Sequence, residues 1–496
     1  MLLLGSALFA SVSLLNPDSL HTTLVIRDVT VIDATGAPPA PHRELLIQDG
    51  RIRAVTALRT LRVPRGAQVV EGGGRFVIPG LWDMHVHMSS IPVSPIARGA
   101  SAYQSNSRYY LPLFIAWGIT GVRDMSGNLE LLTAWRDSVA RGTLLGPRML
   151  VTGFKLGSPH PAMPGAPYPL RTETDVRTTV RMLRDHGADF VKVADLPREL
   201  VPALADECRR QGLVFVGHLP TDMSVTEASQ AGQRGIEHLD GVLLSLSSQA
   251  VELRERERQQ DSWWMRLLVR FHLKDADRSR LELHREILAS ASQVQAERLY
   301  SLLVRNQTWQ EPTLSELRDL HRVPGSTFAA EQRDYVPPLR GPIQLTHWDK
   351  DPALGRLEFD RQVQVVGDMF RAGVSILAGT DTPGPERIPG FSLAEELQLL
   401  VRAGFSPMAA LQAATREPAR FLGATDSLGT IEPGKLADLV LLNGDPLADI
   451  RNVHAVHAVV LRGRYLSPAQ LDSLRASVRS LVAAWRDSVA QQRSRP

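Results

Sequence analysis

The sequence contains a single cysteine, Cys208, and only five lysines among its 56 basic residues. One cysteine excludes an internal disulfide and a cluster of thiolate metal ligands. Basic and acidic residues are interleaved and the formal net charge is only +3, so no nucleic-acid-binding surface is predicted. No apolar run reaches the roughly 18 to 20 residues that a membrane-spanning helix requires. The remaining composition, 43 % hydrophobic and 22 % charged, is ordinary for a globular enzyme.

The first 21 residues differ in composition from the rest of the chain. Residues 1–15 are almost all apolar or small, and Asn16-Pro17-Asp18-Ser19 ends this run. The run resembles the apolar core of a secretory signal, with small residues at 10–13 near a cleavage region, although the usual basic residues are missing. We therefore predict a signal segment at 1–21 and a periplasmic or secreted protein. The alternative is a cytoplasmic enzyme with an apolar N-terminus.

Two regions rich in β-branched and apolar residues lie near opposite ends of the chain. Residues 22–78 contain short strand patterns separated by turns such as Asp49-Gly50. Residues 428–466 contain similar patterns, with a turn at Asn443-Gly444. We predict that segments 22–78 and 425–466 form one small β-sandwich domain built from both chain ends.

Between these regions, residues 79–424 alternate short apolar runs with helical stretches. Typical runs are Phe190-Val191-Lys192-Val193 and Leu213-Val214-Phe215-Val216, and the helices before them end at Gly187 and Gly212. Alternation over roughly 340 residues predicts an α/β fold with a parallel sheet, and this length fits a (β/α)8 TIM barrel. A doubly wound sheet is the structural alternative, because periodicity does not separate the two.

Residues 243–305 interrupt the alternation with a charged, helical segment that is too long for a simple loop. The segment carries an apolar patch from Trp263 to Phe271. We interpret it as a helical insertion over the barrel mouth, which is a lid or, alternatively, a peripheral decoration or a contact in the homo-oligomer that we expect. At the C-terminus, residues 467–496 predict an amphipathic helix that begins at Ser467-Pro468.

Polar residues stand at the ends of several predicted strands. His85 and His87 are two residues apart, so on a strand both imidazoles face one side and can bind one metal ion. Lys192 lies inside a predicted core strand, where a lysine is rarely found without a partner. The residues that follow further apolar runs are His218, His238 and Asp381. Each histidine alone is equally consistent with a buried core residue, but together these groups occupy carboxyl strand ends, where α/β barrels hold active sites.

An ordered series of short motifs extends this pattern through about residues 22 to 466. The series comprises Pro79-Gly80-Leu81-Trp82-Asp83-Met84-His85-Val86-His87, Phe190-Val191-Lys192-Val193, Gly217-His218, Gly235-Ile236-Glu237-His238, Ala378-Gly379-Thr380-Asp381-Thr382, Leu411-Gln412-Ala413-Ala414-Thr415 and Gly429-Thr430-Ile431-Glu432-Pro433-Gly434-Lys435-Leu436-Ala437-Asp438-Leu439-Val440. As a series these motifs are highly specific. The chain resembles the amidohydrolase superfamily, in particular its imidazolonepropionase-like and Xaa-Pro dipeptidase-like branch. That resemblance also implies a (β/α)8 barrel with a flanking β-sandwich.

By this resemblance, the chain is expected to bind two divalent metal ions. The implied ligands are, for the first ion, His85, His87 and Asp381, and, for the second, His218 and His238. A carboxylated Lys192 is implied as the bridge, and a buried amine suits this role because its lowered pKa leaves a neutral form that can take up CO₂. Histidine and carboxylate ligands favour zinc, with manganese or cobalt as alternatives. One departure is Ala394, which stands where the family often carries histidine, and this puts a substrate role of that helix in doubt.

The implied reaction is hydrolysis of an amide C–N bond, with Asp381 as general base and then general acid. Dipeptides or N-acyl amino acids are the first substrate class and a cyclic amide such as an imidazolone is the second. Esters, lactones or phosphotriesters on the same metal centre are the third. A mononuclear deaminase would leave Lys192 without a purpose, and a non-catalytic scaffold would not need six ligand positions. For the carboxylate of a dipeptide, Arg123 and the loop residues Lys155 and His160 are candidate contacts, although His160 is equally consistent with an ordinary loop histidine.

Overall fold

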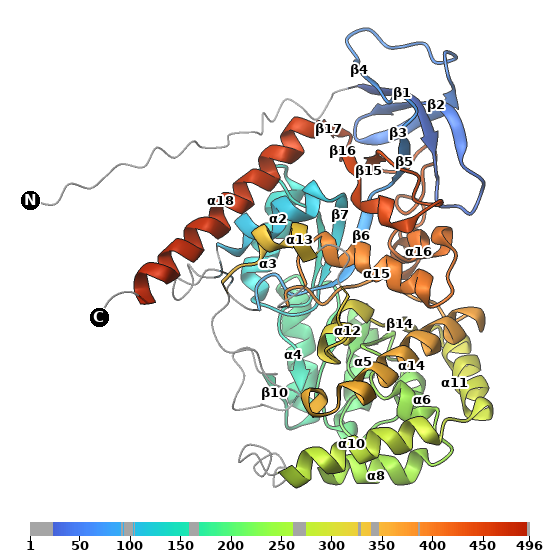
Figure 1. Ribbon diagram of the computed structural model, residues 1–496, viewed down its shortest axis with the longest axis vertical. Coiled ribbons are helices and arrows are strands. Elements are labelled where there is room, and N and C mark those ends of the chain that lie inside the picture. The colour runs from blue at the N-terminus through green and yellow to red at the C-terminus, as the bar shows by residue number, and fades with distance from the viewer. Residues whose placement is uncertain are drawn as a thin grey trace, which may run out of the picture.

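The computed structural model describes residues 23–90, 93, 103, 105–157, 168–260, 274–325, 329–338, 347–384 and 387–493. The predicted signal segment at 1–21, the apolar patch from Trp263 to Phe271 and the candidate His160 lie outside these residues. Within them, the chain forms three sheets surrounded by helices, with a long helix near the C-terminus (Figure 1). This mixed architecture confirms the predicted α/β class.

An eight-stranded sheet combines segments from both ends of the chain. Its strands are β1 (Leu24–Val31), β2 (Ala40–Gln48), β3 (Arg51–Ala57), β4 (Gln68–Glu71), β5 (Phe76–Pro79), β15 (Leu439–Leu442), β16 (Val456–Leu461) and β17 (Arg464–Leu466). They are ordered β17-β16-β15-β5-β1-β2-β3, and β4 pairs with β1. The two chain ends meet where β5 runs antiparallel to β15, with Ile78 opposite Val440. Alternate residues such as Leu45 and Ile47 on β2 are fully buried, which holds this sheet on its own apolar core.

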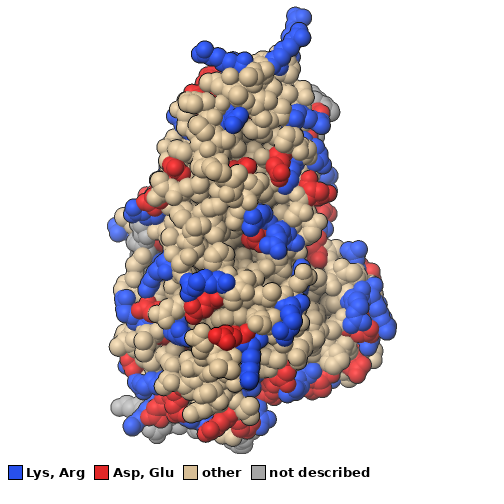
Figure 2. All heavy atoms as spheres, turned by 90° about the vertical axis from the view of Figure 1, so that its right-hand side faces the viewer, with Lys and Arg blue, Asp and Glu red and all other residues tan. Residues whose placement is uncertain are grey.

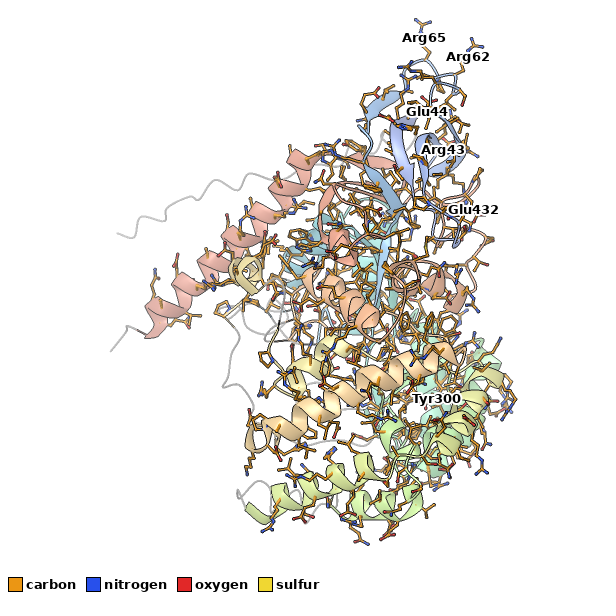
Figure 3. The ribbon with its side chains drawn as sticks, turned by 45° about the vertical axis from the view of Figure 1, so that its right-hand side comes forward. Arg43, Glu44, Arg62, Arg65, Tyr300 and Glu432 are labelled. Carbon is orange, nitrogen blue, oxygen red and sulfur yellow. The ribbon has the colours of Figure 1, made fainter. Side chains whose placement is uncertain are left out.

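The outer tip of this sheet is strongly charged. Arg62 and Arg65 project from it away from the molecule, whereas Glu44 on β2 points inward (Figure 3). Glu44 is buried and pairs with Arg27 at 3.1 Å. On the face drawn in Figure 2, basic and acidic side chains are interspersed along the whole molecule, so that face carries no continuous patch of one sign.

The other two sheets are parallel and lie between the helices. Their strands are β6 (Leu81–Val86), β7 (Ile119–Asp124), β8 (Arg148–Val151), β9 (Leu156–Gly157), β10 (Tyr168–Pro169), β11 (Val191–Val193), β12 (Phe215–Gly217), β13 (Gly235–Glu237) and β14 (Trp309–Glu311). One sheet has the order β6-β7-β8 and the other β10-β9-β11-β12-β13-β14. Segment 375–378 connects them, because Leu377 N–H donates to Gln310 O at 2.9 Å and Met84 N–H donates to Ala378 O at 3.0 Å.

Helices follow most of the parallel strands and cover them. They are α2 (Asn106–Ala116), α3 (Leu129–Ala140), α4 (Glu173–Asp185), α5 (Val201–Gln211), α6 (Val225–Gln230), α12 (Leu314–Leu320), α13 (Ala329–Gln332), α14 (Pro352–Arg371), α15 (Phe391–Arg402), α16 (Pro407–Ala413) and α17 (Arg416–Phe421). Short 3₁₀ helices span η2 (Arg198–Leu200), η3 (Arg333–Tyr335), η4 (His347–Lys350) and η5 (Ile450–His454). Local sequence explains their ends: a capping box of Thr172 and Asp175 starts α4, and Gly212 ends α5 in the left-handed conformation, φ 67°.

The segment that interrupts the alternation is helical. It contains α7 (Val242–Ser245), α8 (Ala250–Gln260), α10 (Lys274–Ala289) and α11 (Gln293–Arg305). Helices α8 and α10 pack together at the lower end of the molecule, with Leu253 and Leu283 in a small apolar cluster between them (Figure 1). Its role as a lid and the expected homo-oligomer stay predictions.

Helix α18 (Pro468–Arg493) lies diagonally across the upper part of the molecule and packs against α2 (Figure 1). Trp485 meets Tyr109 with ring centroids 6.1 Å apart, and Arg475 donates to Ala116 O at 2.7 Å. Within the described part of the chain, none of the helices is long and apolar enough to cross a bilayer.

Candidate metal centre

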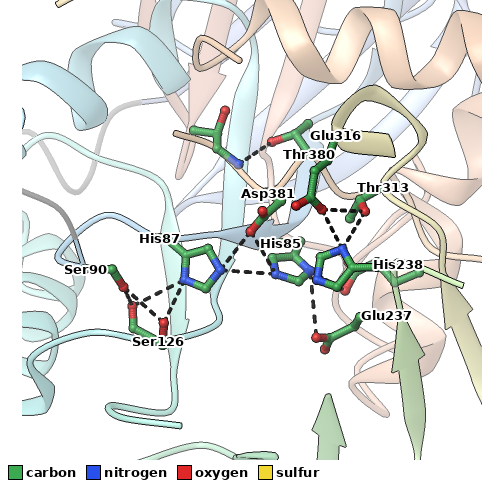
Figure 4. Close-up of polar contacts among 12 residues, drawn as sticks. His85, His87, Ser90, Ser126, Glu237, His238, Thr313, Glu316, Thr380 and Asp381 are labelled. Carbon is green, nitrogen blue, oxygen red and sulfur yellow. Dashed lines mark hydrogen bonds and ion pairs between the residues drawn. The ribbon is translucent and has the colours of Figure 1, made fainter. Parts of the chain in front are cut away.

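Three side chains converge at the carboxyl ends of two neighbouring strand segments. His85 and His87 stand at the end of β6, and Asp381 follows segment 375–378, which hydrogen-bonds to β6. The Nε2 atoms of the two histidines are 3.3 Å apart, and they lie 3.2 Å and 2.8 Å from the same atom, Asp381 Oδ1 (Figure 4). A tetrahedral ion with bonds of about 2.0–2.1 Å holds neighbouring donors roughly 3.3–3.4 Å apart. The spacing of these three donors therefore fits a metal ion.

Asp83 fastens the two backbone segments that carry these donors. Its fully buried carboxylate accepts hydrogen bonds from His85 N–H at 3.2 Å and from the N–H and hydroxyl of Thr380 at 3.1 Å and 2.7 Å. Burial raises the pKa of Asp83 well above its ordinary value, against these hydrogen bonds. Because the carboxylate binds both segments, it fixes His85 relative to Asp381.

Two of the residues at the centre have backbone conformations that side chains other than glycine rarely adopt. His238, directly after β13, has φ 56°, and Asp381 has φ 53°. Such left-handed conformations cost about 1–2 kcal/mol each and concentrate at functional sites. Here they turn both side chains toward the same point, where His238, Glu316 and Asp381 offer ligand atoms within 4.8 Å of one another.

The outer nitrogen of each central histidine has its own partner. His87 Nδ1 lies 2.9 Å from the Ser126 hydroxyl, and His85 Nδ1 lies 3.4 Å from Glu311 Oε2. His238 Nδ1 lies 2.7 Å from the Thr313 hydroxyl and 2.6 Å from Glu316 Oε2 (Figure 4). Partners of this kind orient metal-binding histidines and leave Nε2 as the ligand atom.

Lys192 lies beside this group on β11 and is 0 % exposed. Burial, followed by the positive charge of Lys155, lowers the pKa of Lys192 well below its ordinary value. The amine forms an ion pair with the buried Glu237, which precedes His238. A lysine that loses its proton readily is the form that reacts with CO₂, so its surroundings suit the carbamate implied by the sequence.

His218 follows β12 and completes a chain of rings. Its centroid is 5.1 Å from that of His238, which in turn is 4.7 Å from that of His85. Burial, with the charge of Lys192 as the next cause, lowers the pKa of His218 well below its ordinary value. A neutral imidazole is the form that binds a metal.

The pKa shifts of His85, His87 and Asp381 also favour metal binding, whereas that of His238 does not. Burial lowers the pKa of His85 and of His87. Burial alone would raise the pKa of Asp381, but the two histidines outweigh it and hold that pKa well below its ordinary value. His238 differs, because Glu316 outweighs burial and raises its pKa. Neutral imidazoles and an ionised carboxylate are the donor forms of an oxygen–nitrogen metal site.

A buried layer of charge lies beneath the centre, and Arg123 belongs to it. This arginine is 1 % exposed, donates to Met84 O at 2.8 Å and forms an ion pair with Glu311. It also lies 3.7 Å from Glu237, and its guanidinium packs 4.9 Å from the ring of Phe421. The sequence offered Arg123 as a contact for a substrate carboxylate; in the structure it is buried, and its Nε and Nη2 are engaged by Met84 O and Glu311.

Several residues of the centre were missed in the sequence. Their common feature is that they hold another site residue: Ser126, Glu237, Glu311, Thr313 and Glu316. The signals were weak, because Thr313 and Glu316 match a helix-capping pattern and Glu237 stands inside a strand motif. Arg387, whose Nε donates to Asp381 O at 3.0 Å, lies in a loop with no motif at all.

The model of the amidohydrolase family matches residues 76–466. Because the match covers most of the chain, the protein belongs to the amidohydrolase family, and the resemblance based on the motifs is confirmed.

Individual relatives match to different extents. An imidazolonepropionase of Aromatoleum aromaticum is 43 % identical over 79 residues, 16 % of this chain and 19 % of the relative. An adenine deaminase of Rubrobacter xylanophilus is 24 % identical over 446 residues, 87 % of this chain and 56 % of the relative. The chain thus spans about half or less of the length of these curated relatives. A Xaa-Pro dipeptidase crystallised with methionine in its active site is 20 % identical, with a TM-score of 0.65 over 90 % of this chain and 100 % of that chain, which shows a shared fold.

Proposed function

We propose that this protein is a binuclear metal-dependent hydrolase that cleaves an amide C–N bond. The observation that carries the proposal is the convergence of His85 Nε2, His87 Nε2 and Asp381 Oδ1, 2.8–3.3 Å apart, beside the buried amine of Lys192. Three unbridged donors at this spacing repel one another through their lone pairs unless a cation or a proton lies between them. Family membership supports the same conclusion.

The proposed fold is a (β/α)8 barrel in which segment 375–378 is the last strand. Its support is the two sets of parallel strands, β6-β7-β8 and β10-β9-β11-β12-β13-β14, and the backbone hydrogen bonds that Leu377 donates to Gln310 and Met84 donates to Ala378. A flanking β-sandwich made from both chain ends is proposed with it, supported by the antiparallel pairing of β5 and β15.

The proposed centre holds two ions that share Lys192. His85, His87 and Asp381 would hold one ion, and His218 and His238 the other, with carboxylated Lys192 between them. When bound, such ions polarise the scissile carbonyl and lower the pKa of water to near neutrality, and zinc suits these ligands.

Asp381 is the group that moves a proton. Its low pKa keeps it ionised at neutral pH, so it can accept the proton of the attacking water through its carboxylate oxygen. It then donates this proton to the leaving nitrogen, since an amine leaves more readily than an amide anion. Arg387, 3.5 Å from Asp381 Oδ2, holds the carboxylate in position for both transfers.

Dipeptides or N-acyl amino acids are the proposed substrates, in keeping with the Xaa-Pro dipeptidase among the structural neighbours. Deamination of a purine is a second candidate, favoured by the match over 446 residues to an adenine deaminase. Both reactions hydrolyse a C–N bond, but only deamination releases ammonia from adenine.

Metal analysis and a substrate screen test this proposal together. Purified protein loaded with zinc or manganese is expected to retain about two equivalents per chain, and to hydrolyse members of a panel of dipeptides and N-acyl amino acids. Ammonia release from adenine would favour the second candidate instead. A protein that retains no metal and cleaves no member of either set contradicts the proposal and favours a non-catalytic scaffold.

Lys192→Ala provides a sharper test of the bridge. We expect this variant to lose at least one metal equivalent and its activity, and to regain part of both with a short carboxylate such as propionate, which fills the space of the carbamate. Exposed Lys350→Ala serves as the control and is expected to keep both ions. Retention of two ions by Lys192→Ala would contradict the bridging role.

A further inference from the structure

Lys155 lies on the same side of the parallel strands as Lys192. The residue after it, Leu156, pairs with Val193 of β11 and accepts a hydrogen bond from Ala194 N–H at 2.7 Å. Leu156 and Val193 are fully buried in the apolar cluster that these strands form with α4 and α5. Because successive residues of an extended strand face opposite sides, Lys155 and Lys192 both face away from that cluster, toward the metal centre.

The electrostatics of the centre place the charge of Lys155 close to its ligands. After burial, Lys155 is the largest cause of the lowered pKa of Lys192. It is a minor cause, after burial, of the lowered pKa values of His87 and His218. These effects agree with the strand register, which places Lys155 next to Lys192 on the same side of the sheet.

The Lys155 side chain is half-buried. Among the described residues, no group forms a hydrogen bond or an ion pair with its ammonium. The nearest acid whose pKa it affects, Asp124, already accepts hydrogen bonds from Met88 N–H at 2.7 Å and Ser126 N–H at 3.2 Å. A half-buried ammonium with no partner among the described residues is available to pair with an anion from outside the protein.

We infer that Lys155 binds the carboxylate of the substrate and thereby selects amides that carry an α-carboxylate. This inference rests on the proposed hydrolysis of an amide. In a dipeptide or an N-acyl amino acid, the carboxylate carbon is only two bonds from the scissile nitrogen. The cation that receives it must therefore lie beside the metal ligands rather than at a distant part of the mouth, and Lys155 has that location.

The other cations near the centre are less suitable. Arg123 lies beneath the ligands and is engaged by Glu311 and by Met84 O. Arg387 donates to Asp381 O at 3.0 Å and lies 3.3 Å from Asp319 Oδ2. Both guanidinium groups hold parts of the protein, whereas no group among the described residues forms a hydrogen bond or ion pair with the Lys155 ammonium.

Paired ligands that differ only in charge test this role directly. The probes are N-acetyl-L-leucine and its neutral amide, N-acetyl-L-leucinamide, titrated calorimetrically into the metal-loaded protein. The wild type is expected to bind the acid at least tenfold more tightly than the amide, since a charge-assisted hydrogen bond contributes roughly 10- to 100-fold in affinity. Lys155→Met should lose this preference while binding the amide as before, and Lys155→Arg should retain part of it.

Lys350→Met is the control, because it removes the same charge from an exposed position. If Lys155→Met fails to fold, Lys155→Gln replaces it. A wild type that does not prefer the acid, a preference that survives in Lys155→Met, or equal loss of both probes would overturn the inference. If the wild type hydrolyses neutral amides but does not bind the acid more tightly than the amide, the role of Lys155 is overturned. The proposed hydrolysis is unaffected by that result. Metal-loaded protein that cleaves no amide would contradict the proposed hydrolysis instead.

Discussion

Among the described residues, two clusters place histidines around a carboxylate, and they differ in how the ring nitrogens approach its oxygens. In the candidate centre, His85 and His87 both approach one oxygen, Asp381 Oδ1. In the second cluster, which joins α10, α12 and α14, His284 lies 2.8 Å from Glu358 Oε2 and His321 lies 3.5 Å from Glu358 Oε1. Each imidazole there has an oxygen of its own.

This difference separates a binding site from a structural link. Glu358 pairs with the two histidines through separate oxygens, and the rings of His284 and His321 each pack 4.6 Å from the ring of Trp348. Around Asp381, the donors converge on a common point instead. Among the described residues, the three groups whose ligand atoms converge closely enough for a metal all lie at the candidate centre. Residue type alone therefore does not identify a metal site, whereas the direction of the lone pairs does.

Asp381→Asn should have the largest effect of any change to the two clusters. Asparagine keeps the shape of the side chain but cannot accept the proton of water, so turnover is expected to fall by about 10²- to 10⁴-fold with metal retained. Steady-state kinetics and metal analysis of the same preparation measure both. The matched change in the second cluster, Glu358→Gln, should leave turnover within about twofold of wild type. Full activity of Asp381→Asn would remove Asp381 from the proton transfer.

Glu358→Gln should instead lower stability. The change removes the charge that two imidazoles share in a buried position, where breaking an ion pair costs about 3–5 kcal/mol, and the amide recovers part of this through hydrogen bonds. We expect the free energy of unfolding to fall by about 2 kcal/mol, measured by thermal or urea denaturation. Ser477→Ala, at an exposed position of α18, is the control and should leave the free energy of unfolding unchanged. A Glu358→Gln variant as stable as wild type would show that the second cluster does not contribute to the free energy of unfolding.

Ser126→Ala should have a smaller effect, confined to the centre. The hydroxyl is 2.9 Å from His87 Nδ1, and loss of such a partner typically weakens metal binding by about tenfold or more. Competition with a chelator measures the change. Ser477→Ala, at an exposed position of α18, should leave metal affinity unaltered. Equal affinities of the two variants would mean that Ser126 does not orient His87.

The smallest expected effect is on the pH dependence of stability, which should reveal the charge of the Glu358 cluster. Burial would raise the pKa of Glu358, but its hydrogen bonds with His284 and His321 lower it to about 2. Because this pKa is depressed in the folded protein, the stabilisation is present above the ordinary pKa of about 4.5 and is lost as pH falls from about 4.5 to 2. The melting temperature of Glu358→Gln should therefore depend less on pH than that of wild type in this range. Parallel curves for the two proteins would refute the assignment.

The family and the α/β class could be predicted from the sequence because both depend on signals within short segments. Strand runs that end in polar residues, such as Phe190-Val191-Lys192-Val193, are visible within a few residues. The partners of the site residues are not visible in this way. Arg123 bonds Glu311, 188 residues later, and His238 bonds Thr313, 75 residues later. Such pairs form only when strands become neighbours in the fold, and no periodicity records which strands do so.

The location of Arg123 was hidden from the sequence for the same reason. The sequence offered it as a candidate contact for a substrate carboxylate, whereas β7 (Ile119–Asp124) carries it into the interior. The buried acid that neutralises it belongs to β14. Only the three-dimensional structure shows whether a cation already forms an ion pair within the protein or is available to bind a substrate.

The pairing of β5 with β15 also affects the order in which the protein forms during synthesis. Ile78 of β5 must wait for Val440 of β15, about 360 residues later, which takes roughly 20–70 s at ~5–20 residues per second. Throughout this interval, the backbone N–H and C=O groups on the edge of β5 that will pair with β15 stay unpaired and exposed to solvent near the ribosome. The intervening strands, which carry His85 through Asp381, have time to associate before the edge is covered. In the cell, the nascent chain is thus most vulnerable to aggregation at its N-terminal sheet, and a chaperone that shields β5 would act at that stage.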